Sequence, residues 1–246
     1  MIIIPPQPIT VISSNAATSP DPDNPNYMFS SGMTASEFLT TQTENADLLE
    51  VEIGFDNCDR VALFNLDAYS VDFELTDNNT SSVVQTKTID LAISGYDNEY
   101  QQWVLTGMHI YDNATLKISI NKAGGTVKCG QCGIGLSTYI GDAQWGVQPG
   151  YLDYSIKDEN DFGQTYLNVG PWAKLQDVDV ALNIETLDAV FNDLVNVRGS
   201  LVYIDANGGD GTDFESVRLF GFIEDWSISI NNPTISYVTM SIQGVI

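Results

Sequence analysis

The feature that most constrains the fold is a series of short runs in which apolar and polar side chains alternate, separated by turn-forming residues. Residues 48–55 and 68–75 alternate with a period of two, as strands with one buried face do. Residues 61–66 form a more continuous apolar run, which is typical of a strand covered on both faces. Similar runs lie at 83–93, 102–105, 113–120 and 126–134, and 122–125 is expected to close a hairpin. The pattern predicts a mainly β protein that begins with an antiparallel, jelly-roll-like β-sandwich over residues 48–140.

A second pattern follows a connector rich in Gly and Pro at residues 141–150. Residues 184–199 place apolar side chains at spacings of three and four, which predicts one amphipathic helix. Leu187, Val190, Phe191 and Leu194 are expected on its buried face, with Asp188 and Asn192 outside. Runs typical of strands flank this helix at 151–157, 165–182, 201–205, 216–224, 226–230 and 234–242. Residues 151–246 are therefore predicted to form an α+β domain with one helix on an antiparallel sheet.

Residues 1–47 are predicted to be an irregular N-terminal arm. The stretch 13–25 is dense in Ser, Asn, Asp and Pro, which favour turns over helices or strand ladders. The arm also carries the apolar anchors Tyr27, Met28, Phe29, Phe38 and Leu39. We expect it to pack on its own domain or on a neighbouring subunit; the alternative is a disordered tail.

The charge balance excludes some classes of partner. Nine Lys and Arg stand against 33 Asp and Glu, a formal net charge of −24, so binding of nucleic acid is not expected. With 43% hydrophobic residues the chain has the composition of a folded protein. No apolar run is long enough to span a bilayer, and Pro5 and Pro6 interrupt the opening apolar residues, so neither membrane insertion nor a signal peptide is expected.

The three cysteines suggest a metal site or free thiols. Their odd number suits synthesis in a reducing cytoplasm. Cys129 and Cys132 form a CxxC motif, which can supply two thiolates to zinc, and Cys58 and the single histidine, His109, are the candidates for the other two ligands. The alternatives are a redox disulfide and free thiols.

An Asn-, Asp- and Gly-rich loop at 205–213 is a candidate calcium site. Its oxygen ligands would be Asp205, Asn207, Asp210 and Asp213. The register differs from that of an EF-hand, and the same residue types are common in hairpin turns, which is the alternative interpretation.

No catalytic residues and no cofactor are predicted. Nucleotide-binding glycine motifs and HExxH are absent from the sequence, and His109 lies in no nucleophile motif. Pairs of carboxylates leave glycoside hydrolysis open, because acids are abundant everywhere. Aromatic side chains able to stack on sugar rings are Tyr96, Tyr100, Trp103, Tyr111, Tyr139 and Trp145, although most aromatics of a sandwich belong to its core.

Two segments resemble structural proteins of tailed bacteriophages: NCDRVALFN at 57–65 and LDYSIKDENDFGQT at 152–165. The resemblance covers residues 48–246 in outline. It implies a sandwich similar to carbohydrate-binding modules, an α+β domain, and a minor virion component of the neck, tail or baseplate. The order of elements in the second domain is also similar to that of ring-forming domains in phage tail-tube and distal-tail proteins.

Three functions compete on these grounds. The leading hypothesis is a non-enzymatic virion protein, synthesised in the host cytoplasm, that assembles with itself as a symmetric oligomer and with other virion proteins. The alternative is a module of a virion that binds a host-surface glycan through the first sandwich. The third is a polysaccharide-degrading enzyme.

Overall fold

A computed structural model describes the chain except for residues 6, 8, 17–42, 92–100, 106–107, 160–161, 208–213, 231 and 246. The chain divides into two compact units. The sandwich unit comprises residues 4–138, and the C-terminal unit comprises 139–246 together with 1–3. The described residues are mainly β, with antiparallel sheets and one α-helix, as the alternation predicted.

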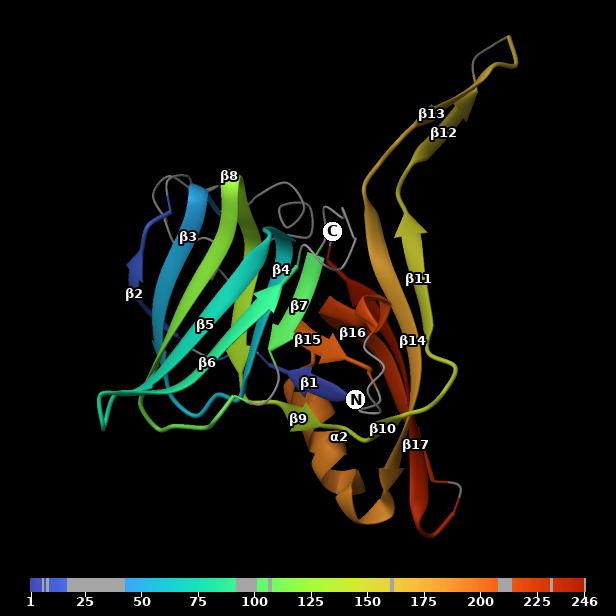
Figure 1. Cartoon of the computed structure of the whole chain (residues 1–246). Coiled ribbons are helices and arrows are strands. Elements are labelled where there is room, and N and C mark those ends of the chain that lie inside the picture. The colour runs from blue at the N-terminus through green and yellow to red at the C-terminus, as the bar shows by residue number, and fades with distance from the viewer. Residues whose placement is uncertain are drawn as a thin grey trace. The chain divides into compact units, whose positions relative to one another are not determined.

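The sandwich unit is a seven-stranded antiparallel sheet wrapped around its own core (Figure 1). Its strands are β2 (Thr10–Ser14), β3 (Thr43–Phe55), β4 (Arg60–Asp67), β5 (Ser70–Asp77), β6 (Ser82–Asp90), β7 (Gln101–Leu105) and β8 (Ala114–Gly135). The first half of β8 lies between β3 and β5, whereas the second half lies between β3 and β4. The β5–β6 and β4–β7 ribbons therefore diverge from β8. They enclose a core that includes Leu49, Ile53, Leu63, Phe73 and Ile118.

One predicted turn of this unit is wrong, because residues 122–125 do not close a hairpin. They are an outward bulge within the continuous strand β8, opposite the single residue Asp47 of β3. Asp47 has a φ of 62°, and its Oδ1 accepts a hydrogen bond of 2.7 Å from the Gly124 N–H. That bond stabilises the extra residues without ending the strand.

The C-terminal unit is built on an eight-stranded antiparallel sheet (Figure 1). Its strands are β1 (Ile2–Ile4), β9 (Thr138–Tyr139), β10 (Asp142–Ala143), β11 (Gln148–Asp153), β14 (Trp172–Asn183), β15 (Val202–Asp205), β16 (Arg218–Ser229) and β17 (Ile235–Gly244). The short 3-10 helix η3 (Ile184–Thr186) leads into α2 (Leu187–Asn196), which packs on the sheet through Val190 and Leu194. A second 3-10 turn, η4 (Glu215–Val217), precedes β16.

The beginning of the chain differs from the irregular arm predicted for residues 1–47. Ile2–Ile4 form β1, which lies between β15 and β9, and Thr10–Ser14 form β2 at the edge of the sandwich. These short segments carry too little alternation to be recognised locally, because their pairing partners lie far along the chain. The anchors Tyr27, Met28, Phe29, Phe38 and Leu39 lie outside the described residues.

The predicted buried face of the helix is also wrong at one position. Val190 and Leu194 are buried at 3% and 1% exposure, but Phe191 is 46% exposed. Its ring makes an edge-to-face contact with Trp226, at 5.3 Å between centroids. Successive helical residues are turned by about 100°, so Phe191 lies at the margin of the buried stripe and not at its centre.

A long two-stranded ribbon leaves the C-terminal sheet. Beyond the paired strands β11 and β14, the chain continues into β12 (Ile156–Glu159) and β13 (Thr165–Asn168), which pair only with each other. Figure 1 shows this hairpin extending past the ends of β11 and β14. No helix among the described residues is long and apolar enough to cross a membrane.

Candidate functional site

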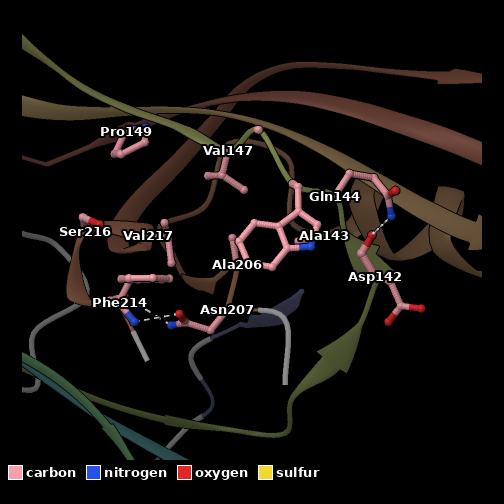
Figure 2. Close-up of a pocket in the computed structure, with 12 residues that line it drawn as sticks. Asp142, Ala143, Gln144, Val147, Pro149, Ala206, Asn207, Phe214, Ser216 and Val217 are labelled. Atoms are coloured by element: carbon pink, nitrogen blue, oxygen red, sulfur yellow. Dashed lines mark hydrogen bonds between the residues drawn. The ribbon is translucent and has the colours of Figure 1, made fainter. Parts of the chain in front are cut away.

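The C-terminal unit contains a cavity of about 610 Å³ (Figure 2). Its walls come from the loop between β10 and β11 and from the segments that end β15 and begin β16. The residues that line it are Asp142, Ala143, Gln144, Trp145, Gly146, Val147, Pro149, Ala206, Asn207, Phe214, Ser216 and Val217. A volume of this size falls within the range of small-molecule sites, roughly 300–1,000 Å³.

A shift of strand register creates the first wall. Asp142 and Ala143 of β10 pair with Ala181 and Val180 of β14, whereas Gln148 of β11 pairs with Asp177. Residues 144–147 thus stand opposite only residues 178 and 179, so the extra backbone bulges out of the edge. Trp145 lies in this bulge and is 89% exposed.

Two backbone features hold the bulge in place. A Cβ at Gly141 would lie 2.4 Å from the carbonyl oxygen of Ala181, so this close approach to β14 requires glycine. The Gln144 N–H donates to the Asp179 carbonyl over 2.8 Å, and the Gln144 Nε2 donates to the Asp142 carbonyl over 3.0 Å. Trp145 therefore projects from a well-anchored turn.

A side-chain clamp builds the opposite wall. The Asn207 Oδ1 accepts a hydrogen bond of 2.9 Å from the Phe214 N–H, and the Asn207 Nδ2 donates to the Phe214 carbonyl over 3.3 Å (Figure 2). These bonds close the base of the loop 207–214 and place the half-exposed Phe214 ring at the cavity. Both ends of the cavity therefore carry an accessible aromatic ring.

A buried ion pair supports this clamp. The Arg218 Nε donates to the Asp205 Oδ2 over 3.2 Å, and both side chains are less than 10% exposed. The Asp205 Oδ1 accepts from the Asn207 N–H and Nδ2 at 2.8 and 2.7 Å. Asp205 thus links the core of the sheet to the pocket wall.

Tyr139 lies beside the pocket and donates its hydroxyl to the Asp142 carboxylate. Partial desolvation and the adjacent carboxylate raise the pKa of Tyr139 to about 12. The hydroxyl therefore stays protonated at neutral pH and remains a hydrogen-bond donor.

The chemistry of this lining suits a neutral polar ligand that has apolar faces. Trp145 and Phe214 offer ring surfaces, Ala206, Val147 and Val217 form an apolar floor, and Gln144 and Ser216 add polar groups. Such a mixture is typical of sites where a few hydrogen bonds orient a ligand held mainly by surface contact.

The four zinc candidates are not gathered into one site. Cys129 and Cys132 lie within the continuous strand β8 and are buried in the sandwich core, whereas His109 is exposed. The Cys58 thiol contacts the Asp56 carbonyl and the Gln7 Oε1 at 3.4 and 3.5 Å. Across the described part of the chain, no three His, Cys, Asp or Glu side chains are grouped so that they could hold a metal ion.

Burial also makes the cysteines poor ligands. It raises the pKa of the Cys58 and Cys129 thiols to about 12 and raises the pKa of Cys132 well above its usual value. Metal binding requires thiolates, which this environment disfavours. The CxxC spacing suggested a tight turn, but the strand continues through it.

The predicted calcium ligands fall into two groups. Asp205 and Asn207 are engaged in the ion pair and the loop clamp described above. Asp210 and Asp213 lie outside the described residues, so the calcium site stays a prediction.

The candidate sugar-stacking aromatics are placed differently from expectation. Tyr139 and Trp145 are exposed, at 59% and 89%, but both belong to the C-terminal unit and not to the sandwich. Tyr111 is half-buried against the sandwich core. Tyr96, Tyr100 and the side chain of Trp103 lie outside the described residues. Phe214 was missed, since nothing near it in sequence distinguishes it from a core phenylalanine.

Comparisons with known proteins give little guidance. No protein-family model matches the chain, and no curated protein matches it. The lectin domain of lectinolysin, solved in complex with Lewis B antigen, is similar to the chain with a TM-score of 0.33 and 11% identity. The match covers 51% of this chain and 93% of that domain. A TM-score this low supports no inference about fold or ligand, and the resemblance to phage structural proteins stays a prediction.

Proposed function

We propose that the chain is a non-enzymatic carbohydrate-binding protein and that the pocket of the C-terminal unit is its glycan site. The observation that carries the proposal is Trp145, 89% exposed on an anchored bulge at the edge of a 610 Å³ cavity. A large apolar ring is rarely left in water unless it serves a binding surface. A pyranose ring offers the flat C–H face that packs on such an indole.

The rest of the pocket supports a sugar over other small ligands. Gln144, Ser216 and the protonated Tyr139 hydroxyl provide hydrogen-bonding groups around the two rings, which fits a ligand rich in hydroxyls. A net charge of −24 disfavours anionic ligands such as sialylated or sulfated glycans. The proposed ligand class is therefore a neutral oligosaccharide.

Binding to a glycan array, followed by calorimetric titration with the best ligand, tests this proposal. Trp145→Ala should weaken binding at least about 10-fold, because burying an aromatic face is worth roughly 1.5–3 kcal/mol. Trp145→Phe should retain most of the affinity. Tyr69→Ala removes an aromatic residue that is 51% exposed on the other unit and serves as the matched control.

Two results would contradict the proposal. One is the absence of glycan binding by the wild-type chain; the other is equal affinity in wild type and Trp145→Ala. Mass spectrometry of the bound glycan after prolonged incubation tests the non-enzymatic part, since hydrolysis products would show a glycosidase. The virion role of the leading hypothesis stays a prediction.

A further inference from the structure

The hairpin formed by β12 and β13 is the most exposed part of the described chain. We refer to residues 154–170 as the hairpin arm. Every residue of its two strands is exposed, and five of its large apolar side chains face solvent: Ile156 (62%), Phe162 (89%), Tyr166 (53%), Leu167 (56%) and Val169 (77%). Isolated two-stranded hairpins are marginally stable in water, so an arm of this composition needs a surface to pack on.

The base of the arm is rigidly joined to the sheet. The Tyr154 N–H donates to the Pro171 carbonyl over 3.0 Å, and the Gly170 N–H donates to the Ser155 Oγ over 3.0 Å. A Cβ at Gly170 would lie 2.5 Å from the Tyr154 carbonyl oxygen, so the strands approach closely there. The Gln243 Nε2 of β17 donates to the Tyr154 hydroxyl over 3.2 Å. These contacts give the arm a fixed root and set its direction.

A second apolar surface lies at the other end of the same unit. On the outer side of α2, Phe191 and Val195 are 46% and 41% exposed and lie one turn apart. We call these two residues the helix patch. The arm joins β14 at Trp172, and the helix follows its other end at Asn183. A strand of this length spans roughly 40 Å at about 3.3 Å per residue, so the arm cannot reach the helix patch of its own chain.

We propose that the hairpin arm docks on the helix patch of a second copy of this chain. Two unlike apolar surfaces at opposite ends of one unit make a head-to-tail contact, in which each copy gives its arm to one neighbour and its helix to another. This interface is independent of the proposed glycan site, because Trp145 and Phe214 belong to neither surface.

The exposed area of the arm is sufficient for such an interface. Its apolar side chains present roughly 500 Å², taking about 150–250 Å² for each fully exposed aromatic residue. A standard interface buries about 800 Å² on each partner, a little over half of it apolar. The arm therefore supplies about the apolar area that one side of a stable interface needs.

Charge separates self-association from binding to a basic partner. Each copy carries a net charge of −24, so two copies repel one another at low ionic strength. Added salt screens this repulsion and leaves the apolar contact intact. Self-association should strengthen with salt, whereas docking of a basic protein should weaken.

Sedimentation velocity of the full chain over a range of concentrations, at low and high salt, tests the proposal. The wild type should form dimers or larger species that are favoured by salt, and Ile156→Ser combined with Leu167→Ser should shift the population to monomer. Val83→Ser is the matched control, since Val83 is 53% exposed on β6 of the other unit, and it should leave association unchanged. Circular dichroism melts verify that each variant folds.

Mixing two variants tests the head-to-tail geometry. The arm variant keeps its helix patch, and Val195→Ser keeps its arm, so each should be monomeric alone while an equimolar mixture forms heterodimers. A wild type that is monomeric at every concentration and salt, or an arm variant that still associates, would overturn the proposal. Monomeric variants that fail to complement each other would overturn the arm-to-helix contact. Glycan titration of the arm variant should give wild-type affinity, so failure of the two proposals can be distinguished.

Discussion

The two units of this chain treat their large apolar side chains differently. Among the described side chains of the sandwich unit, the exposed large hydrophobic residues are scattered singly: Ile12, Tyr69, Val83, Ile110 and Leu136. The C-terminal unit exposes many more, and most of them gather in two places. Trp145 and Phe214 meet at the pocket, whereas Ile156, Tyr166 and Leu167 belong to the hairpin arm.

This difference indicates a division of labour. Scattered exposed residues are normal for a folded domain and need no explanation, but clustered ones mark surfaces where something binds. The sandwich core is complete within the unit, with Leu49, Ile53, Val61 and Leu63 all fully buried. We therefore assign both binding surfaces to the C-terminal unit, contrary to the expectation that the sandwich would bind the glycan.

The largest effect is expected from breaking the ion pair behind the pocket. Asp205→Ala should destabilise the C-terminal unit by about 3–5 kcal/mol, because it leaves the Arg218 guanidinium buried without its carboxylate. Urea unfolding measures the loss. The double variant Asp205→Leu with Arg218→Met should lose much less, since no charge is then left buried. Equal losses in the two variants would show that packing, and not the unpaired charge, is responsible.

A similar but slightly smaller effect is expected in the sandwich. Leu63→Ala removes a fully buried side chain and should cost about 2–5 kcal/mol through lost transfer energy and a cavity. Because every residue that lines the pocket belongs to the other unit, glycan affinity below the melting temperature should not change. A weakened affinity in folded Leu63→Ala would break the proposed division between the units.

Local patterns predicted the elements better than they predicted the site. Residues 68–75 alternate in sequence, and β5 shows the same alternation in burial, because period two is a property of neighbouring residues. By contrast, the pocket depends on a register shift between β10–β11 and β14 and on a clamp some 60 residues further along. Such pairings cannot be read from one segment alone.

Residue chemistry was recognised correctly in some places but given the wrong role. Asp205 and Asn207 were predicted as calcium ligands because oxygen-rich loops bind calcium, yet their oxygens accept hydrogen bonds from Arg218 and Phe214. Trp145 was identified as a candidate for stacking on sugars, and it lies at the pocket. Its neighbours could not be foreseen, because Phe214 reaches the pocket only through the folded loop.

The helix provides a comparison at intermediate magnitude. Leu194→Ala should cost about 2–5 kcal/mol, since Leu194 is 1% exposed in the core of the C-terminal unit. Phe191→Ala should cost only about 1 kcal/mol, because the ring is half exposed and loses mainly its edge-to-face contact with Trp226. Asp188→Ala, on the outer face, should change stability by less than about 0.5 kcal/mol. Thermal melts at low protein concentration, where association does not contribute, give the ranking.

The smallest effect at neutral pH is expected at the cysteines, all of which lie in the sandwich unit. Burial raises the pKa of Cys58 and Cys129 from the usual 9.0 to about 12, so the native thiols remain neutral and closed to reagents. Maleimide should label none of them in the folded chain at pH 7 and should label all three in urea.

The same shifts give the sandwich a dependence on alkaline pH. A thiol whose pKa is raised by folding favours the folded state below its unfolded pKa, and that contribution is lost as the pH rises from about 9 towards 12. Stability of the sandwich should therefore be flat near neutrality and decline above about pH 9. Replacing the three cysteines with alanine should flatten the decline, although cavities lower the stability at every pH. Tyr139 supplies a weaker alkaline dependence to the C-terminal unit, because the pKa of its exposed hydroxyl is raised from 10.0 to about 12. An undiminished alkaline decline in the cysteine-free variant would place the titrating groups elsewhere and remove this distinction between the units.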